Sequence, residues 1–443
     1  MSARVRPELG LLPLVAVIFF NVSGGPYGIE DAVSSFGPGL VLALLVLTPL
    51  VWSLPVALAM AELATALPEE GGYVEWVRRA FGPFWSFQSG WWSWLNSFVD
   101  VAVYPALFAD YLKFWRPDTS PMERWLVVLV FVWVLTALNL VGVRITGWVA
   151  VVFAAAALLP MVAFTAAAGL AAQHVPWRPL AADGQGILSG LGLGLAVMMW
   201  NYSGWDTPTT CLGETRAAGT SFRRAQWAAL PLITLGYVLP VGAALAASGD
   251  WSKWDTGYWP VVARAIGGAG LAAAVTVGAL MASAGLFLSL LLTNSRLPYA
   301  LAAAGQMPAA LARVDARFGT PWAAVLLSSA AYSVCAFWSF KELIVLNVWL
   351  YSVTLILELA AFVALRLREP DLPRPWRVGG GTAGMLVTAV LPMALSALAM
   401  ATAGWTNTLV GTAAILTGPT AYLLWRDAGG RLVIKAGGGE PRA

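Results

Sequence analysis

The sequence has few charged side chains, a single histidine and only two cysteines. Lys, Arg, Asp and Glu make up 11% of its 443 residues, hydrophobic residues make up 59%, and the mean hydropathy is +0.73. Because a soluble chain typically carries about 25% charged residues, this composition excludes most soluble enzymes and disordered proteins. The formal net charge of +3 implies no polyanionic partner such as nucleic acid. The composition instead indicates a chain that uses a lipid bilayer as its solvent.

The rarity of histidine and cysteine excludes further classes of site. His174 lies in the polar stretch QHVPWRPLAADGQG and has no second histidine with which to bind a metal ion. Cys211 and Cys335 cannot build a disulfide framework. A membrane enzyme would need paired nucleophiles or metal ligands, and an ATP-driven pump would need a phosphate-binding loop of the form G-x-x-x-x-G-K-[ST]. We therefore expect no enzyme activity, no catalytic residue, no metal and no cofactor.

Twelve apolar runs are long enough to cross a membrane as helices, which takes about 20 residues each. They are roughly 9–35, 39–67, 83–113, 123–143, 146–172, 186–213, 225–247, 268–295, 321–339, 342–365, 383–402 and 405–425. The short alternating strands of a membrane barrel are not apparent. The sequence thus predicts an all-α integral membrane protein with 12 transmembrane helices in a single domain, 1–443.

The basic residues indicate the orientation, since Lys and Arg accumulate in cytoplasmic connections. Most of the arginines fall in the connections on the side of the N-terminus, among them the pairs Arg78-Arg79 and Arg223-Arg224. The opposite side has Lys113, Arg116, Arg124, Arg178, Lys253, Arg264 and Lys341. We expect both termini to be cytoplasmic, which fits an even number of spans.

Two of the runs are interrupted in the same manner. In 9–35 the apolar stretch is followed by Ser23-Gly24-Gly25-Pro26-Tyr27-Gly28 and then by Glu30 and Asp31. In 186–213 it is followed by Asn201-Tyr202-Ser203-Gly204-Trp205-Asp206. Non-helical backbone inside a bilayer must be satisfied by neighbours or by a ligand. Broken helices in the first and sixth runs indicate an inverted-repeat transporter with a site at the midplane, whereas a close-packing kink is the alternative for either break alone.

Several stretches resemble the amino acid–polyamine–organocation transporter superfamily, and the resemblance spans nearly the whole chain. PEEGGYVEWVRRAFGPFWSFQSGWWSWL (68–95) is similar to that family's connection between its second and third helices, and Gly213-Glu214-Thr215 to its stretch after the sixth-helix break. VSGGPYGIEDAV, Trp52-Ser53-Leu54-Pro55 and VDVAVYPALFADYLK (99–113) look most like the polyamine-uptake and L-type amino acid transporter branch. The resemblance implies a five-plus-five inverted repeat, with helices 1–5 in 9–172, helices 6–10 in 186–365 and two further helices in 383–425.

Acids inside the predicted spans are the main candidates for a site, because an ionised side chain in hydrocarbon is costly and usually functional. Asp206 directly follows the second break, Asp100 lies midway along the third run, and Glu30 or Asp31 would line the outer path. Ring faces can also contact a cation. We expect the substrate site to include Gly24, Gly25, Pro26, Tyr27, Glu30, Asp31, Asp100, Tyr104, Asn201, Tyr202, Trp205 and Asp206.

Four other acids stay outside the expected site. Glu62 lies close to an inner turn, where the resemblance suggests a structural or gating role. Asp110 and Glu214 lie near the ends of spans and are expected at the interface. Glu358 lies in the tenth run, and the sequence assigns it no role.

The coupling ion follows only by elimination. Sodium-coupled relatives use hydroxyls of the eighth helix, but Ser283, Ser289 and Thr293 contain no adjacent pair. Some proton-coupled relatives use a lysine of the fifth helix, which the fifth run lacks. We expect proton coupling through Asp100, Asp206 or Glu30, with exchange and facilitated diffusion left open.

The predicted function is uptake of a cationic amine, such as putrescine or spermidine, by a secondary transporter of the bacterial inner membrane that works by alternating access. A transporter or exchanger of cationic or neutral amino acids is the alternative, since backbone N–H groups at Gly24 and Gly25 would suit an α-carboxylate. The expected partners are this small molecule, protons and the lipid bilayer, without nucleic acid. The expected assembly is a monomer or a homodimer.

Overall fold

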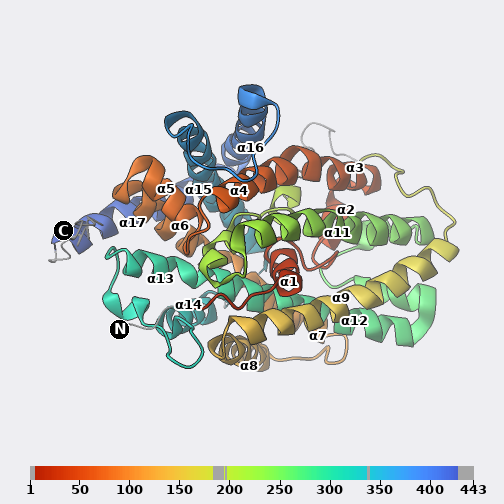
Figure 1. Ribbon diagram of the computed structural model, residues 1–443. Helices are drawn as coiled ribbons and strands as arrows, with labels where there is room; N and C mark the ends of the chain where they lie inside the picture. The colour runs from red at the N-terminus through yellow and green to blue at the C-terminus, as the bar shows by residue number, and fades with distance from the viewer. Residues whose placement is uncertain (1–4, 183–193, 195–196, 337–339, 428–443) are drawn as a thin grey trace, which may run out of the picture.

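The computed structural model describes residues 5–182, 194, 197–336 and 340–427. Regular structure in these residues is helical, and their one β-bridge, between Leu9 and Thr215, is isolated. The helices pack as a bundle, with the first and last described segments at the same end of it (Figure 1). Eight helical segments of the described chain are long and apolar enough to cross a membrane. The chain is therefore an all-helical, multi-pass membrane protein.

The first part of the chain forms nine helices and one π-helical turn. The turn, η1 (Pro49–Ser53), joins α3 and α4 into one long apolar segment. The helices are α1 (Leu11–Val22), α2 (Glu30–Phe36), α3 (Pro38–Thr48), α4 (Leu54–Ala66), α5 (Tyr73–Phe81), α6 (Pro83–Asp100), α7 (Val103–Leu112), α8 (Pro121–Leu140) and α9 (Val143–Leu170).

The second part of the described chain begins at the end of the sixth run. The beginning of the expected run 186–213 and the end of 321–339 lie outside the described residues. The elements are η2 (Thr207–Glu214), α11 (Ala218–Ala247), η3 (Trp251–Lys253), α12 (Trp259–Asn294), α13 (Arg296–Ala303), η4 (Ala309–Ala312), α14 (Trp322–Cys335), α15 (Phe340–Arg368), α16 (Gly381–Thr402) and α17 (Trp405–Asp427).

Several boundaries differ from the expected runs, and α11 begins at Ala218 instead of near residue 225. The third run is divided, because α6 ends at Asp100 and α7 begins at Val103. The eighth run begins earlier than expected, since α12 starts at Trp259 and continues through a kink at Gly268, whose φ is 73°. Positive φ costs glycine little, so the chain bends at Gly268 without strain.

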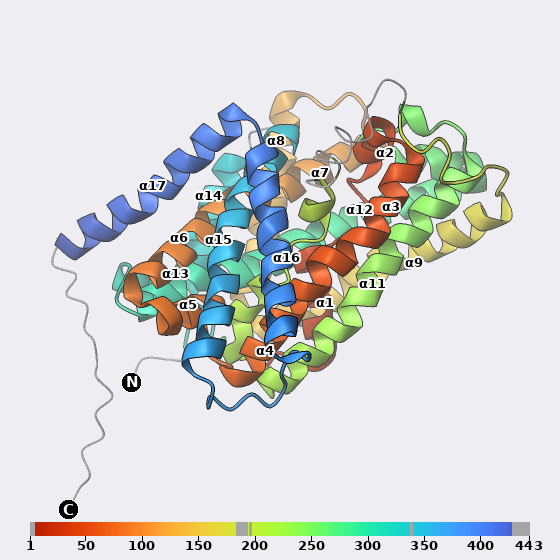
Figure 2. The ribbon, with the colours of Figure 1, turned by 90° about the horizontal axis from the view of Figure 1, so that it is seen from above.

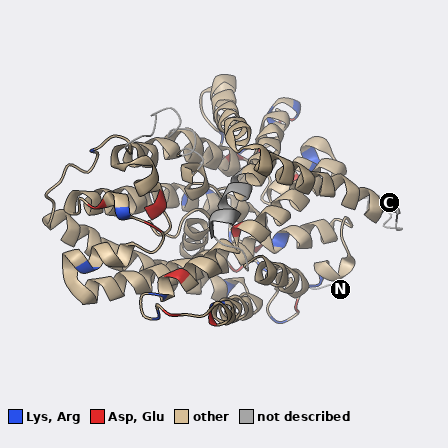
Figure 3. Ribbon diagram, turned by 180° about the vertical axis from the view of Figure 1, so that it is seen from behind, with Lys and Arg blue, Asp and Glu red and all other residues tan. Residues whose placement is uncertain are grey.

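The burial of the helices follows their position in the bundle. In the most apolar stretch of the segment that contains α12, 89% of the residues are buried. The corresponding share is 28% for α8 and 22% for α9. Large apolar side chains such as Val130 and Leu159 are exposed on these outer helices, as expected for helices that face lipid. Seen from above, α12 runs among other helices and α17 at the edge (Figure 2). Lys, Arg, Asp and Glu are sparse along the helices, and most residues of the bundle are uncharged (Figure 3).

Candidate functional site: a polar cavity between the two helix breaks

The first break lies between α1 and α2. The Ser23 backbone N–H still bonds the Phe19 carbonyl, but Gly25 and Gly28 then adopt φ values of 94° and 91°. Such values favour glycine, so the sequence Gly24-Gly25-Pro26 ends the helix inside the bundle. The predicted interruption of the first run is present at the predicted residues.

The second break lies against the last turn of α1, immediately before the first break. Gly204 has a φ of 99°, and a Cβ atom built on it would overlap the backbone carbonyl oxygen of Asn21. Beyond the break, η2 continues as a short 3-10 helix from Thr207. The second break therefore touches the backbone at the end of α1, just before the first break, and this close approach requires glycine at position 204.

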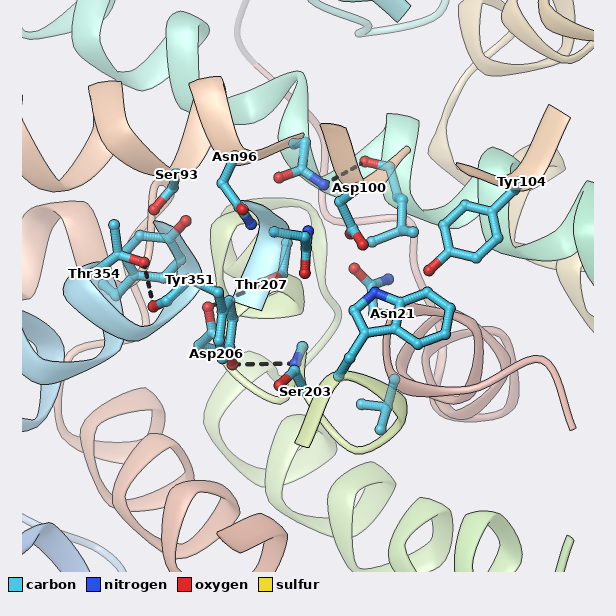
Figure 4. Close-up of a pocket in the computed structure, with 17 residues that line it drawn as sticks. Asn21, Ser93, Asn96, Asp100, Tyr104, Ser203, Asp206, Thr207, Tyr351 and Thr354 are labelled. Carbon is cyan, nitrogen blue, oxygen red and sulfur yellow. Dashed lines mark hydrogen bonds between the residues drawn. The ribbon is translucent and has the colours of Figure 1, made fainter. Parts of the chain in front are cut away.

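A cavity lies beside this contact (Figure 4). Its walls come from the end of α1, from α5, α6, α7, α12 and α15, and from the second break. The 17 lining residues are Asn21, Val22, Tyr73, Ser93, Asn96, Asp100, Tyr104, Trp200, Ser203, Gly204, Asp206, Thr207, Leu290, Asn294, Asn347, Tyr351 and Thr354.

The cavity contains two carboxyl groups and no basic side chain among its lining residues. Asp206 lies with Tyr351 on one side, and Asp100 lies with Tyr104 on the other (Figure 4). Because the site contributes negative charge and no Lys or Arg, it favours a cationic ligand over an anionic one.

Asp206 is positioned by the helix that faces it. The Tyr351 hydroxyl donates a hydrogen bond to Asp206 Oδ1, and the same hydroxyl accepts the backbone N–H of Gly204 at 3.1 Å. Thr207 Oγ1 lies 3.4 Å from Asp206 Oδ2. Tyr351 thus joins α15 to both the backbone and the carboxyl group of the second break.

Asp100 is the last residue of α6 and is half-buried. The side chains of Trp200 and Asn347 face its carboxyl group, and Tyr104 follows one turn later on α7. The division between α6 and α7 therefore falls at the carboxyl group that faces the cavity.

Of the predicted site residues, Asp100, Tyr104 and Asp206 line this cavity. The glycines of the first break lie outside its lining, and the Gly25 N–H, which we expected to be free for a ligand carboxylate, donates to Ser23 Oγ at 3.0 Å. A Cβ on Gly24 would overlap the Leu286 side chain, so Gly24 packs against α12.

The aromatic residues and the amide at the breaks are occupied by contacts with neighbouring residues. Tyr27 donates to the Ala157 carbonyl, Tyr202 to that of Leu45 and Trp205 to that of Tyr202. The Asn201 amide donates to the Val197 carbonyl, and Pro26 accepts a hydrogen bond from the Trp259 indole. Their predicted contact with substrate stays a prediction that this arrangement does not favour.

The two acids after the first break differ in burial. Glu30 is 0% exposed and accepts hydrogen bonds from the Tyr111 hydroxyl and the backbone N–H groups of Gly28 and Gly257. Asp31 is partly exposed and accepts a hydrogen bond from Thr256 at 2.8 Å. Glu30 thus ties α2 to α7 and to the loop before α12.

The sequence interpretation missed most of the polar lining. The missed residues share one property, a polar group within an apolar helix or at its end. They are Asn21, Ser93, Asn96, Ser203, Thr207, Asn294, Asn347, Tyr351 and Thr354. Their polarity against an apolar background was the available signal, although it does not say which side of a helix faces the cavity.

Two acids near the ends of helical segments lie in ion pairs. Glu62 lies 3.2 Å from Arg366 and 3.3 Å from Arg374, and accepts the Val378 backbone N–H. Glu214, which we expected at the interface, is instead buried and pairs with Arg296. Both pairs connect segments far apart in the sequence, which fits the structural or gating role expected of Glu62.

The sequence profile of the amino acid permease family matches residues 9–424. The chain belongs to this family. It is 39% identical to a probable polyamine transporter of Arabidopsis thaliana, over 95% of this chain and 87% of that one. It is 36% identical to a polyamine transporter of Oryza sativa subsp. japonica, over 94% of this chain and 77% of that one.

A more distant relative is an aromatic amino acid transport protein of Shigella flexneri, 24% identical over 70% of this chain and 68% of that one. Together with the family match, these relatives confirm the predicted resemblance to the amino acid–polyamine–organocation superfamily. They make this permease a membrane transporter of the amine or amino acid type.

Proposed function

We propose that this permease is a secondary active transporter that takes up a cationic amine, such as putrescine or spermidine, by alternating access and with proton coupling. The observation that carries the proposal is the cavity at the helix breaks, which holds Asp100 and Asp206 but no basic side chain. A di- or polyamine is a chain with an ammonium group at each end. Carboxyl groups on two sides of one cavity match that distribution of charge.

Asp206 is the better-placed of the two for a primary ammonium group. It lies in the second break, two residues after the glycine that contacts the end of α1. An ammonium ion offers three donors to the carboxyl, amide and hydroxyl oxygens around it. Asn96, Ser203 and Thr354 supply such groups on the cavity wall. The names of the plant relatives support a polyamine as the substrate.

An amino acid is the alternative substrate, favoured by the distant aromatic amino acid relative. An α-carboxylate would need free backbone N–H groups or a cation. The Gly25 N–H is engaged by Ser23, and the cavity lining has no Lys or Arg. These two observations favour the amine.

Proton coupling is the preferred energy source. Two hydroxyls of the eighth run serve as donors within the protein, Ser283 to the Ala279 carbonyl and Thr293 to Asn21 Oδ1. Asp100 and Asp206 can carry protons at the cavity, whereas Glu30 is held by three donors. We retain Asp100 and Asp206 as coupling candidates ahead of Glu30.

The proposal includes the topology of the superfamily. It has twelve spans, repeats over 9–172 and 186–365, two added helices over 383–425, and cytoplasmic termini in a cell membrane. The contact of the second break with the end of α1, directly before the first break, supports this arrangement.

The test is ligand-induced thermal stabilisation of the purified protein, since a ligand that binds only the folded state stabilises it by mass action. The panel is putrescine, spermidine, arginine, lysine, leucine and alanine. We expect stabilisation by the amines, lost in Asp206→Asn and kept in Asp250→Asn, which alters an exposed acid. Stabilisation by leucine or alanine alone would overturn the proposal of a cationic amine as substrate, while the membership of the permease family would stand.

A further inference from the structure

Glu358 lies on the face of α15 that lines the cavity. Tyr351 and Thr354 belong to the cavity wall, and Glu358 follows Thr354 by four residues, which places it on the same side of the helix. The residue is 1% exposed. The cavity face of α15 therefore continues to a buried carboxyl group.

Neither carboxyl oxygen of Glu358 has a hydrogen-bond partner among the described residues. Three other buried acids each have partners that suit a negative charge. These are Glu62 with Arg366 and Arg374, Glu214 with Arg296, and Glu30 with Tyr111 and two backbone amides. A buried carboxylate without a counter-ion is very costly, so Glu358 requires a proton or a mobile cation.

The ionisable groups that act on Glu358 are acids and phenols. Asp206 and the hydroxyls of Tyr73 and Tyr351 interact with it electrostatically. Tyr73 and Asp206 both line the cavity. Glu358 is thus electrostatically linked to the carboxyl group proposed to hold the substrate.

The helices packed against α15 supply no free cation to Glu358 within the described residues. On α4, Glu62 is held by its two arginines, and α16 carries no ionisable side chain. The other ionisable groups are engaged elsewhere or are acids and phenols. They are Glu75 and Arg78 paired on α5, Arg79 paired with Glu369, Asp100 on α6, Tyr104, Asp110 and Tyr111 on α7, and Tyr422 on α17. The side chains of Arg426 and Asp427, in the last turn of α17, lie outside the described residues.

We propose that Glu358 is the site that carries the coupling proton. This inference rests on the proposed function and adds a residue to the carboxyl groups named there. A charged Glu358 cannot be enclosed in the bundle without a cation, so closure over the substrate requires one proton on this carboxylate. The proton comes from water on the side where the cavity is open. It returns to water on the opposite side, and only the O–H bond of Glu358 forms and breaks.

The experiment uses the purified full chain in liposomes with labelled putrescine. In the wild type, an inward proton gradient drives accumulation above the equilibrium level, and a pH dye inside the liposomes reports proton entry with the substrate. In Glu358→Gln we expect unchanged thermal stabilisation by putrescine and unchanged exchange of internal for external putrescine. Gradient-driven accumulation and substrate-linked proton entry are lost. Glu69→Gln, at an exposed acid, is the matched control.

A second measurement tests protonation directly. Infrared difference spectra recorded across a pH titration should contain the carbonyl bands of protonated carboxyl groups in the wild type, and the contribution of one buried carboxyl group should be lost in Glu358→Gln but kept in Glu69→Gln. Glu358→Asp should restore part of the accumulation.

Two results would overturn the inference. One is gradient-driven accumulation by Glu358→Gln equal to that of the wild type. The other is loss of putrescine binding by a folded Glu358→Gln protein, which would make Glu358 a substrate ligand. A wild type that ignores the proton gradient removes proton coupling from the proposed function and the inference with it. If the proton gradient drives accumulation equally well in the wild type and in Glu358→Gln, only the inference about Glu358 fails and the proposed function stands.

Discussion

Arg296 and Glu214 form a two-point ion pair, with Arg296 Nε 2.6 Å from Glu214 Oε1 and its Nη2 atom 3.0 Å from Glu214 Oε2. Arg296 is 0% exposed and Glu214 is 1% exposed. Glu214 ends η2, and its carbonyl accepts the Leu9 backbone N–H just before α1. The pair therefore holds together the segments before α1, after the second break and after α12.

Breaking this pair from either side should be strongly destabilising, because one charge then stays buried without its partner, at a cost of about 3–5 kcal/mol. Arg296→Gln should cost more than Glu214→Gln, since the buried Glu70 carboxyl also feels the Arg296 charge. Thermal unfolding in detergent checks the order. The double variant should unfold at a higher temperature than Arg296→Gln, and equal unfolding temperatures would contradict a stabilising pair.

Gly204→Ala should abolish transport and lower stability. The added Cβ atom would overlap the Asn21 carbonyl oxygen. The alanine backbone would also have to adopt a φ of 99°, which costs a non-glycine residue about 1–3 kcal/mol. Gly236→Ala is the control, because a Cβ there meets no other atom within 4 Å and alanine favours the helix. Uptake by a Gly204→Ala protein at the level of Gly236→Ala would show that the second break does not touch the end of α1.

Tyr351→Phe should weaken substrate binding while the protein stays folded. The change removes the donor to Asp206 and leaves the Gly204 N–H without its acceptor, and an unsatisfied buried group costs about 1–3 kcal/mol. That cost lowers stability, whereas the loss of the donor that orients Asp206 acts on binding. We expect a rise in KM of about tenfold, which corresponds to about 1.4 kcal/mol of binding free energy. Tyr422→Phe, whose ring packs on Phe84 and Phe87, should leave KM unchanged.

Glu30→Gln should reduce stability without changing which substrates are transported. All three partners of the Glu30 carboxyl are donors, and a glutamine amide would turn N–H groups towards some of them, at a cost of about 1–3 kcal/mol. Unfolding temperature and competition profiles measure the two effects separately. A changed substrate profile with unchanged stability would place Glu30 in the outer path, as the sequence first suggested.

The composition and the two glycine-bearing breaks predict the helical membrane fold, because bilayer thickness and backbone satisfaction leave few alternatives. The carboxyl groups Asp100 and Asp206 can be predicted at the cavity for a similar reason, since buried charge is rarely accidental. Tyr27 and Tyr202 could not be placed from sequence. An aromatic residue beside a break can face the cavity or a neighbouring helix. Here the Tyr27 and Tyr202 hydroxyls donate hydrogen bonds to the backbone carbonyls of Ala157 and Leu45.

The residues that α15 adds to the site could not be predicted from the sequence either. In the sequence, Tyr351 is one of several aromatic residues in an apolar run, without a feature that marks it as a site residue. The packing of α15 against the second break brings its hydroxyl to Asp206. The role proposed for Glu358 depends on the absence of hydrogen-bond partners for its carboxyl group among the described residues, which no sequence pattern reveals.

Uptake of labelled putrescine into liposomes by the wild type, Asp206→Asn and Asp250→Asn proteins tests the central claim most directly. The account predicts saturable uptake by the wild type and by Asp250→Asn, competed by unlabelled spermidine but not by leucine. Uptake by Asp206→Asn should be lost although the protein unfolds at a similar temperature. Undiminished uptake by Asp206→Asn, or competition by leucine alone, would contradict the claim that these carboxyl groups recognise a cationic amine.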